Sequence, residues 1–100
     1  MEKVALEKLT AEDFRKHLGQ SVRLLGNPEL EAEIWKVTDI SNPLIQGRAA
    51  FSVEFRTNGE MGYFPQGILP VSHPDIGLME LFIVPLGADA QGMRYEAIFS

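Results

Sequence analysis

The last third of the chain alternates apolar and polar residues with a period of two. Three such segments, residues 68–72, 78–85 and 93–99, are separated by turn sequences rich in Gly, Pro and Asp. In the last segment Tyr95 and Ala97 fall on the opposite parity from Glu96. Because successive side chains of a strand point to opposite faces, this pattern predicts an antiparallel sheet with one buried face.

Three segments nearer the N-terminus also have strand character, at residues 21–25, 29–40 and 49–56. Within the second of these, the apolar parity switches near Ile34 and Trp35. A change of parity inside one strand indicates an extra residue on that strand, so we expect a β-bulge at this point.

A tight turn is predicted directly after the third of these segments. Asn58-Gly59 is the strongest two-residue hairpin signal, because both positions tolerate positive φ angles. A turn centred on these two residues would place Val53 opposite Phe64. The sequence therefore predicts a hairpin whose return strand contains Phe64.

The clearest helix signal covers residues 9–19. Thr10 has the side chain of an N-cap, and Asp13 lies three residues later, where the acid of a capping box belongs. Phe14 and Leu18 are four positions apart and would share one helix face. A helix of about two turns is not stable alone, so we expect it to dock on the sheet.

These elements predict a mainly β fold: an antiparallel six- to seven-stranded meander, closed as a small barrel or sandwich, with one short N-terminal helix. One hundred residues form a single domain, residues 1–100. The expected core consists of the inward-facing apolar residues of the helix and strands. These are Phe14, Leu18, Val22, Leu24, Ile34, Phe51, Val53, Phe55, Phe64, Leu69, Val71, Leu81, Ile83, Tyr95, Ala97 and Phe99.

Charge and composition narrow the function classes. Nine basic residues stand against 14 acidic ones, giving a net charge of −5, which argues against binding nucleic acid or anionic membranes. The chain has no cysteine, which removes disulfides and thiol chemistry and favours the cytoplasm. The N-terminus does not have the pattern of a signal peptide, and no apolar run is long enough to span a bilayer.

His73 and Asp75 form the most suggestive chemical pair, with His17 as the second histidine of the chain. The ordinary interpretation is a turn, in which His73 precedes a proline and Asp75 bonds its own backbone. An enzyme or metal site would require the fold to bring His17, 56 positions away, next to His73. The sequence therefore predicts no enzyme, no metal site and no cofactor.

Glu29, Glu31 and Glu33 alternate along the second predicted strand and would share one face. Such a row could bind a cation or a basic partner. It could also be a charged edge that blocks strand-to-strand aggregation, and this edge interpretation is favoured.

Trp35 and Tyr63 are the aromatic candidates for a recognition surface, because each falls off the apolar parity of its strand. Exposed aromatic side chains are enriched at protein interfaces. Each could equally cover a second, minor core. Trp35, Tyr63 and the acidic row are thus the predicted interaction surface.

Several short motifs resemble a small, uncharacterised bacterial domain family of about 100 residues. The motifs are Pro65-Gln66-Gly67, His73-Pro74, Glu80-Leu81-Phe82 followed by Val84-Pro85, and Tyr95-Glu96-Ala97 with Phe99. All are strand and turn residues, so the resemblance implies a fold and carries over no functional residue. It also implies a structural or assembly role in the setting of phage-tail or collar-like proteins.

The residues and the resemblance together predict a non-enzymatic interaction module, which self-associates or binds an unidentified protein partner. The alternative is a small-ligand-binding β-barrel, whose cavity would use inward polar groups such as Gln66 or Tyr95. A ligand cavity usually needs at least about 300 Å³, which is demanding for a barrel of 100 residues.

Overall fold

The computed structural model describes residues 3–40, 50–58 and 64–99. These residues form a short 3₁₀ helix, one α-helix and six strands. The elements are η1 (Leu6–Lys8), α1 (Ala11–Arg15), β1 (Ser21–Leu24), β2 (Leu30–Ile40), β3 (Ala50–Thr57), β4 (Gly67–His73), β5 (Gly77–Ala88) and β6 (Met93–Phe99). Each of these six strands was predicted, with ends that agree within three residues.

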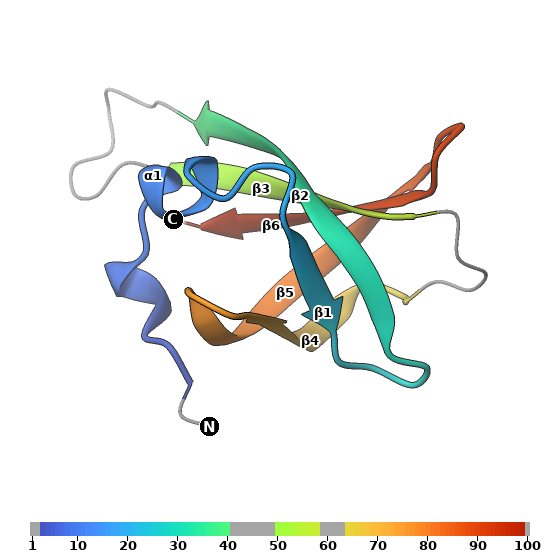
Figure 1. Cartoon of the computed structure of the whole chain (residues 1–100), viewed down its shortest axis with the longest axis horizontal. Helices are drawn as coiled ribbons and strands as arrows, with labels where there is room; N and C mark the ends of the chain where they lie inside the picture. Colours follow the sequence, from blue (N-terminus) through green and yellow to red (C-terminus); the bar gives the residue numbers. More distant parts are fainter. Residues whose placement is uncertain (1–2, 41–49, 59–63, 100) are drawn as a thin grey trace.

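The six strands form a closed antiparallel barrel in the order β1-β2-β3-β6-β5-β4 (Figure 1). Of the two predicted forms, a barrel or a sandwich, the structure shows the barrel. Its chain path consists of two three-stranded meanders, β1–β3 and β4–β6, which we call the first and second meander. They join along β3 and β6 on one side. On the other side β1 meets β4 over two residue pairs, Arg23–Ser72 and Leu24–Val71, which we call the seam.

The hairpin predicted after β3 is wrong. Val53 pairs with Val37 on one side and with Ala97 on the other, so no backbone position is left for Phe64. Phe64 lies outside the strands. The long, strongly alternating β6 takes the position beside β3, because a closed barrel pairs all its strands and removes the open edge.

The predicted bulge is confirmed. The register between β2 and β3 shifts between Ile34 and Lys36, which leaves Trp35 as the extra residue. Beyond the bulge, Val37 pairs with Val53 and packs against the core. The inward-facing residues of β2 are thus at even positions up to Ile34 and at an odd position, Val37, after the bulge. The bulge therefore explains the change of apolar parity along the strand.

Helix α1 closes one end of the barrel. Thr10 and Asp13 form the predicted capping box, with both reciprocal hydrogen bonds present. Phe14 is fully buried and packs its ring against Phe51 and Phe99 at centroid distances of 5.9 and 5.1 Å. Leu18 was wrongly predicted in the core and is 47% exposed. The helix ends before Leu18 is reached, so the four-residue spacing from Phe14 no longer sets its direction.

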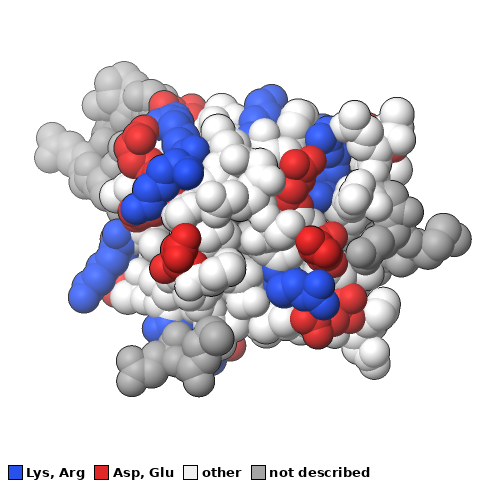
Figure 2. Space-filling model, viewed as in Figure 1, with Lys and Arg blue, Asp and Glu red and all other residues white. Residues whose placement is uncertain are grey.

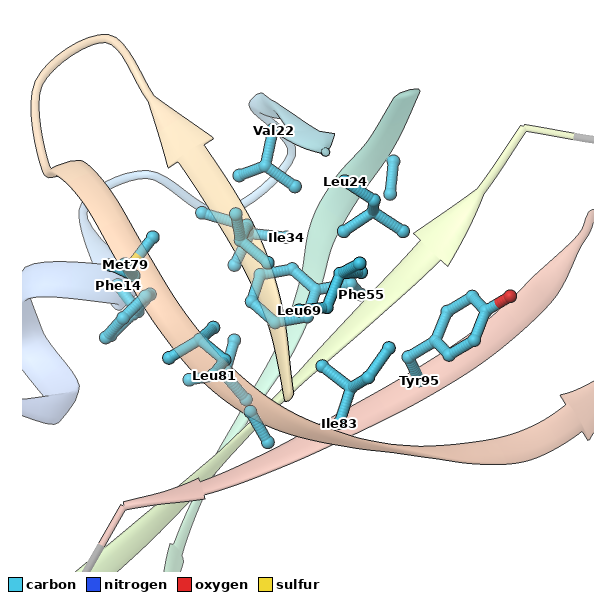
Figure 3. Packing of buried hydrophobic residues seen from close by; sticks show 14 of the residues in the cluster. Phe14, Val22, Leu24, Ile34, Phe55, Leu69, Met79, Leu81, Ile83 and Tyr95 are labelled. Carbon is cyan, nitrogen blue, oxygen red and sulfur yellow. The ribbon is translucent and has the colours of Figure 1, made fainter. Parts of the chain in front are cut away.

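The interior of the barrel is filled by apolar side chains from all six strands and α1 (Figure 3). Fifteen of the 16 predicted core residues are buried, Leu18 being the exception. Four further residues join them: Leu9, Leu30, Ala32 and Met79. Leu30 and Ala32 follow from the alternation that was recognised in β2, so the pattern was informative and was under-used.

Phe64 and Tyr95 close the core away from α1. The Phe64 backbone N–H donates to the Tyr95 hydroxyl oxygen at 2.8 Å, and the two rings lie 6.2 Å apart. Gly26 lies directly against the Phe64 ring, and a Cβ at this position would overlap that ring. The turn between β1 and β2 thus needs a glycine so that Phe64 can cover the core.

Candidate functional site

The acidic row lies on the outside of the first meander and is not at an edge. Strand β2 is hydrogen-bonded to β1 on one side and to β3 on the other, so the edge interpretation is wrong. Arg23 is the register partner of Glu31. Its guanidinium donates to Glu29 at 2.9 Å and lies 3.9 Å from Glu31. These two acids are therefore matched by a basic side chain of the neighbouring strand.

Glu33 is matched in the same way by Arg56 of β3, its register partner. The Arg56 Nη2 atom donates to Glu33 Oε1 at 2.8 Å, and Nη1 reaches Asp89 at 3.4 Å. The hydrogen bonds that Arg56 donates, first to Glu33 and then to Asp89, hold the pKa of its guanidinium above the ordinary value. Two backbone N–H groups, of Gln91 and Gly92, and then Arg56 lower the pKa of Asp89.

Trp35, the bulge residue, is half-buried, so it belongs neither to the core nor to a free aromatic patch. The guanidinium carbon of Arg56 lies 4.6 Å from its ring centroid, and Lys36 Nζ lies 5.9 Å away. These distances are those of cation–π contacts. Around them, acidic and basic side chains lie next to one another over β1 and β2 (Figure 2). Tyr63, the other predicted aromatic, lies outside the described residues.

The outside of the second meander has a different chemistry. Ile68, Phe82 and Ile98 point outward from β4, β5 and β6 and are 72%, 53% and 60% exposed. Ile68 is the register partner of Phe82. Ile83 pairs with Ala97, so the next step of the same register places Phe82 beside Ile98. We call these three residues the apolar row.

Acidic side chains border the apolar row. Glu80 precedes Phe82 by two positions on β5 and is ion-paired with Lys3 at 2.6 Å. Glu96 precedes Ile98 by two positions on β6 and has the same outward parity. The apolar row was missed in the sequence, although the alternation of all three strands already assigned these positions to the outer face.

A second candidate site lies where the end of α1 meets the turn between β4 and β5. The rings of His17 and His73 are 4.4 Å apart, so the fold does bring the two histidines together. The Gln20 Oε1 atom lies between them, 2.8 Å from His17 Nδ1 and 2.9 Å from His73 Nε2. Asp75 Oδ2 is 4.0 Å from His17 Nδ1.

The hydrogen bonds fix one arrangement of protons in this cluster. The backbone N–H groups of Asp75 and Ile76 both donate to His73 Nδ1, at 3.0 and 3.1 Å. Nδ1 must therefore be unprotonated, and the ring proton of neutral His73 is on Nε2. This proton is donated to Gln20 Oε1, so His17 Nδ1 also acts as a donor to the same oxygen.

This arrangement does not suit a metal ion, although ligand atoms of His17, His73 and Asp75 lie within 4.8 Å of one another. A metal bound at His73 Nε2 would require a proton on Nδ1, which would face two backbone N–H donors. Burial, and then the neighbouring His17, lower the pKa of His73 below 6.5, while Asp75 acts in the opposite direction. His73 is thus built into its turn as a neutral hydrogen-bond acceptor.

Comparison with known proteins adds the family. A family model described as "Domain of unknown function (DUF6916)" matches residues 9–99. The chain belongs to this family. The match covers the whole barrel and α1, in agreement with the predicted resemblance to a small family of unknown function. No curated protein and no solved structure matches the chain.

The barrel of this DUF6916 member does not use the two residues that were predicted to line a ligand cavity. Tyr95 is buried and bonded to Phe64, and Gln66 is exposed, so neither lines an interior cavity. A pocket of about 320 Å³ lies at the α1 end of the barrel, where Glu7, Leu9 and Thr10 face β2 and β3.

Among the described residues, no helix has the length and apolar character needed to cross a bilayer.

Proposed function

We propose that this domain is a non-enzymatic protein-interaction module that docks on another protein through the apolar row. One observation carries the proposal: three large apolar side chains, Ile68, Phe82 and Ile98, are exposed on adjacent strands of a closed barrel. A contiguous exposed apolar patch, as opposed to scattered single residues, is typical of an interaction site. Aromatic anchors such as Phe82 often carry much of the binding energy.

The charge of the domain selects the kind of partner. The chain carries a net charge of −5, and two acids border the apolar row: Glu96, and Glu80, which is ion-paired with Lys3. A second copy would bring the same negative charge to the contact, which opposes self-association through this face. A partner with an apolar centre and a basic rim complements the surface. We therefore favour a different protein over a second copy.

The hydrogen bonding of His73 supports the non-enzymatic part of the proposal. The two nitrogens of His73 are both engaged, one by two backbone N–H groups and the other by Gln20. A general base needs a free lone pair within reach of a substrate proton. The placement of the partner in a phage-tail-like assembly, and of the domain in the cytoplasm, is a further proposal from the resemblance and the lack of cysteine.

Site-specific crosslinking tests this function. A photoreactive phenylalanine analogue is placed at position 82 or, as a control, at Ile40. The crosslinked products are compared in cells of the organism that produces the protein. Ile40 is a matched control, because it is 39% exposed and lies on β2 of the first meander. We expect one defined protein with a basic surface to crosslink at position 82 and to be absent from the control.

The contradicting outcomes are distinct. A crosslink between two copies of the chain would replace the foreign partner with a homodimer. Identical products at positions 82 and 40 would show that the apolar row has no specific role. A small molecule retained by the purified domain in native mass spectrometry, with no protein crosslinked, would favour the ligand-binding barrel.

A further inference from the structure

We propose that His17, Gln20 and His73 form a clasp that fastens the segment after α1 to the turn between β4 and β5 at neutral pH and releases it in mild acid. The clasp is independent of the apolar row and of the proposed function, since it lies at the α1 end of the barrel. It joins residues 53 positions apart in the chain, Gln20 and His73.

The clasp depends on a single oxygen atom that accepts two hydrogen bonds. Gln20 Oε1 receives the proton of His73 Nε2 and the proton of His17 Nδ1. On its far side His73 accepts the backbone N–H groups of Asp75 and Ile76. One neutral imidazole ring therefore connects the turn to Gln20, and Gln20 connects it to the end of the helical segment.

Protonation of His73 breaks the bonds on the Nδ1 side of the ring and so frees the turn, while the Nε2–H bond to Gln20 remains. A charged imidazole carries a proton on both nitrogens, so Nδ1 becomes a donor that faces the N–H groups of Asp75 and Ile76. Both amides lose their acceptor in a partly buried position. If His17 is charged as well, two like charges lie 4.4 Å apart between ring centroids.

The charged and titratable groups around the rings leave this repulsion largely in place. Asp75, from the turn, approaches His17 and is exposed. On the α1 side, Asp13 and Lys16 line the same surface pocket and lie 4.0 Å from each other, so their charges offset. Only Asp75 therefore favours a charged histidine among the described neighbours, and it acts on an exposed side.

A shallow pocket lies between the helical segment and the turn that the clasp holds together. It has a volume of about 210 Å³ and is lined by Asp13 of α1, by Lys16 and His17 directly after the helix, and by Asp75 and Ile76 of the turn. Leu9, a buried core residue, is also part of its lining. Release of the turn would widen this pocket and expose Leu9 and Ile76, while the ladder between the six strands remains paired.

The direction of the pH effect follows from linkage. His73 has a lower pKa in the folded chain than the 6.5 of an unfolded one, so the unfolded or opened state binds the proton first. The stabilisation by neutral His73 is complete above about pH 6.5. It is lost as the pH falls through 6.5 towards the lower folded-state pKa.

Amide hydrogen exchange followed by NMR tests the clasp. Protection factors of the Asp75 and Ile76 amides are compared at pH 7.5 and pH 5.5, alongside the ring nitrogen signals of both histidines. We expect roughly tenfold lower protection of these two amides at the lower pH, with strand amides unchanged. We also expect His73 to carry its neutral proton on Nε2.

His73→Asn is the matched variant. The Asn side-chain oxygen can occupy the place of Nδ1 and accept the same amides, but it does not titrate near neutral pH. We expect its protection factors to be independent of pH in this range. If the variant fails to fold, the wild-type protection factors and nitrogen signals still decide.

Three results would overturn the clasp. The first is equal protection of Asp75 and Ile76 at both pH values in the wild type. The second is a neutral His73 with its proton on Nδ1. The third is a rise in melting temperature when zinc alone is added at pH 7.5, because this would identify the cluster as a metal site.

Discussion

The two meanders of the barrel bury the same kind of residue inward and present opposite chemistry outward. On the first meander, Glu33 and Arg56 face each other across β2 and β3 and form a 2.8 Å ion pair. On the second meander, the equivalent outward pair across β4 and β5 is Ile68 and Phe82. One outer surface thus satisfies its own charges, while the other leaves apolar area in contact with water.

This difference teaches where to look for function in a small barrel. Inward residues are set by packing, and they are alike on both halves. Outward residues are free to vary, and matched ion pairs at a surface contribute little and need no partner. Exposed apolar side chains gain free energy only when something covers them. The second meander is therefore the half on which we propose that a partner docks.

The inside and outside of β5 should respond very differently to truncation. Leu81→Ala removes a buried side chain and is expected to lower the free energy of unfolding by about 2–5 kcal/mol. Phe82→Ala, one residue away on the exposed face, is expected to change it by less than about 0.5 kcal/mol. Urea unfolding of both variants measures the difference. Equal losses would mean that Phe82 belongs to the core.

The ionic surface of the first meander should be sensitive to geometry and salt. Arg56→Lys keeps the charge but loses the planar contact with Trp35 and the two-acid geometry with Glu33 and Asp89. We expect a loss of stability that is a small fraction of that for Leu81→Ala. The difference from wild type should shrink further at roughly 1 M salt, where the screening length is about 3 Å. Thermal unfolding at low and high salt measures both effects.

Replacing the outward apolar pair of the second meander with a charged pair should change stability only slightly. The double variant Ile68→Arg with Phe82→Glu places an opposite-charge pair at register partners, as in the first meander. We expect the free energy of unfolding to stay within about 1 kcal/mol of wild type. Binding of a hydrophobic dye should be abolished, and so should crosslinking to the partner from the photoreactive analogue when it is placed at Ile98 instead of position 82. Retention of either would show that the apolar row is not the contact surface.

Local patterns predicted the elements well. The alternation in residues 93–99 gave β6 with its observed ends, and the capping box at Thr10 and Asp13 formed as expected. The parity change at Trp35 correctly predicted the bulge. These features depend on neighbours within a few positions, so the sequence contains the information directly.

Pairings between distant segments were not predicted. The strand beside β3 is β6 and not the segment of Phe64, because barrel closure decides the partner and a local turn signal cannot. For the same reason the meeting of His17, Gln20 and His73 was not expected. Nothing in the sequence marked Gln20 as a site residue, because its role depends on contacts with both histidines that only the folded chain provides.

The seam between β1 and β4 makes one side of the barrel easier to open than the other. Two residue pairs and a hydrogen bond from the Leu25 N–H to the Pro70 carbonyl hold this junction, whereas six residue pairs join β3 to β6 on the opposite side. Because fewer backbone contacts must be broken here, we expect a pulling force or a thermal fluctuation to separate β1 from β4 before the other strand pairs. The opened molecule would be a six-stranded curved sheet with two free edges, able to accept a strand from another chain.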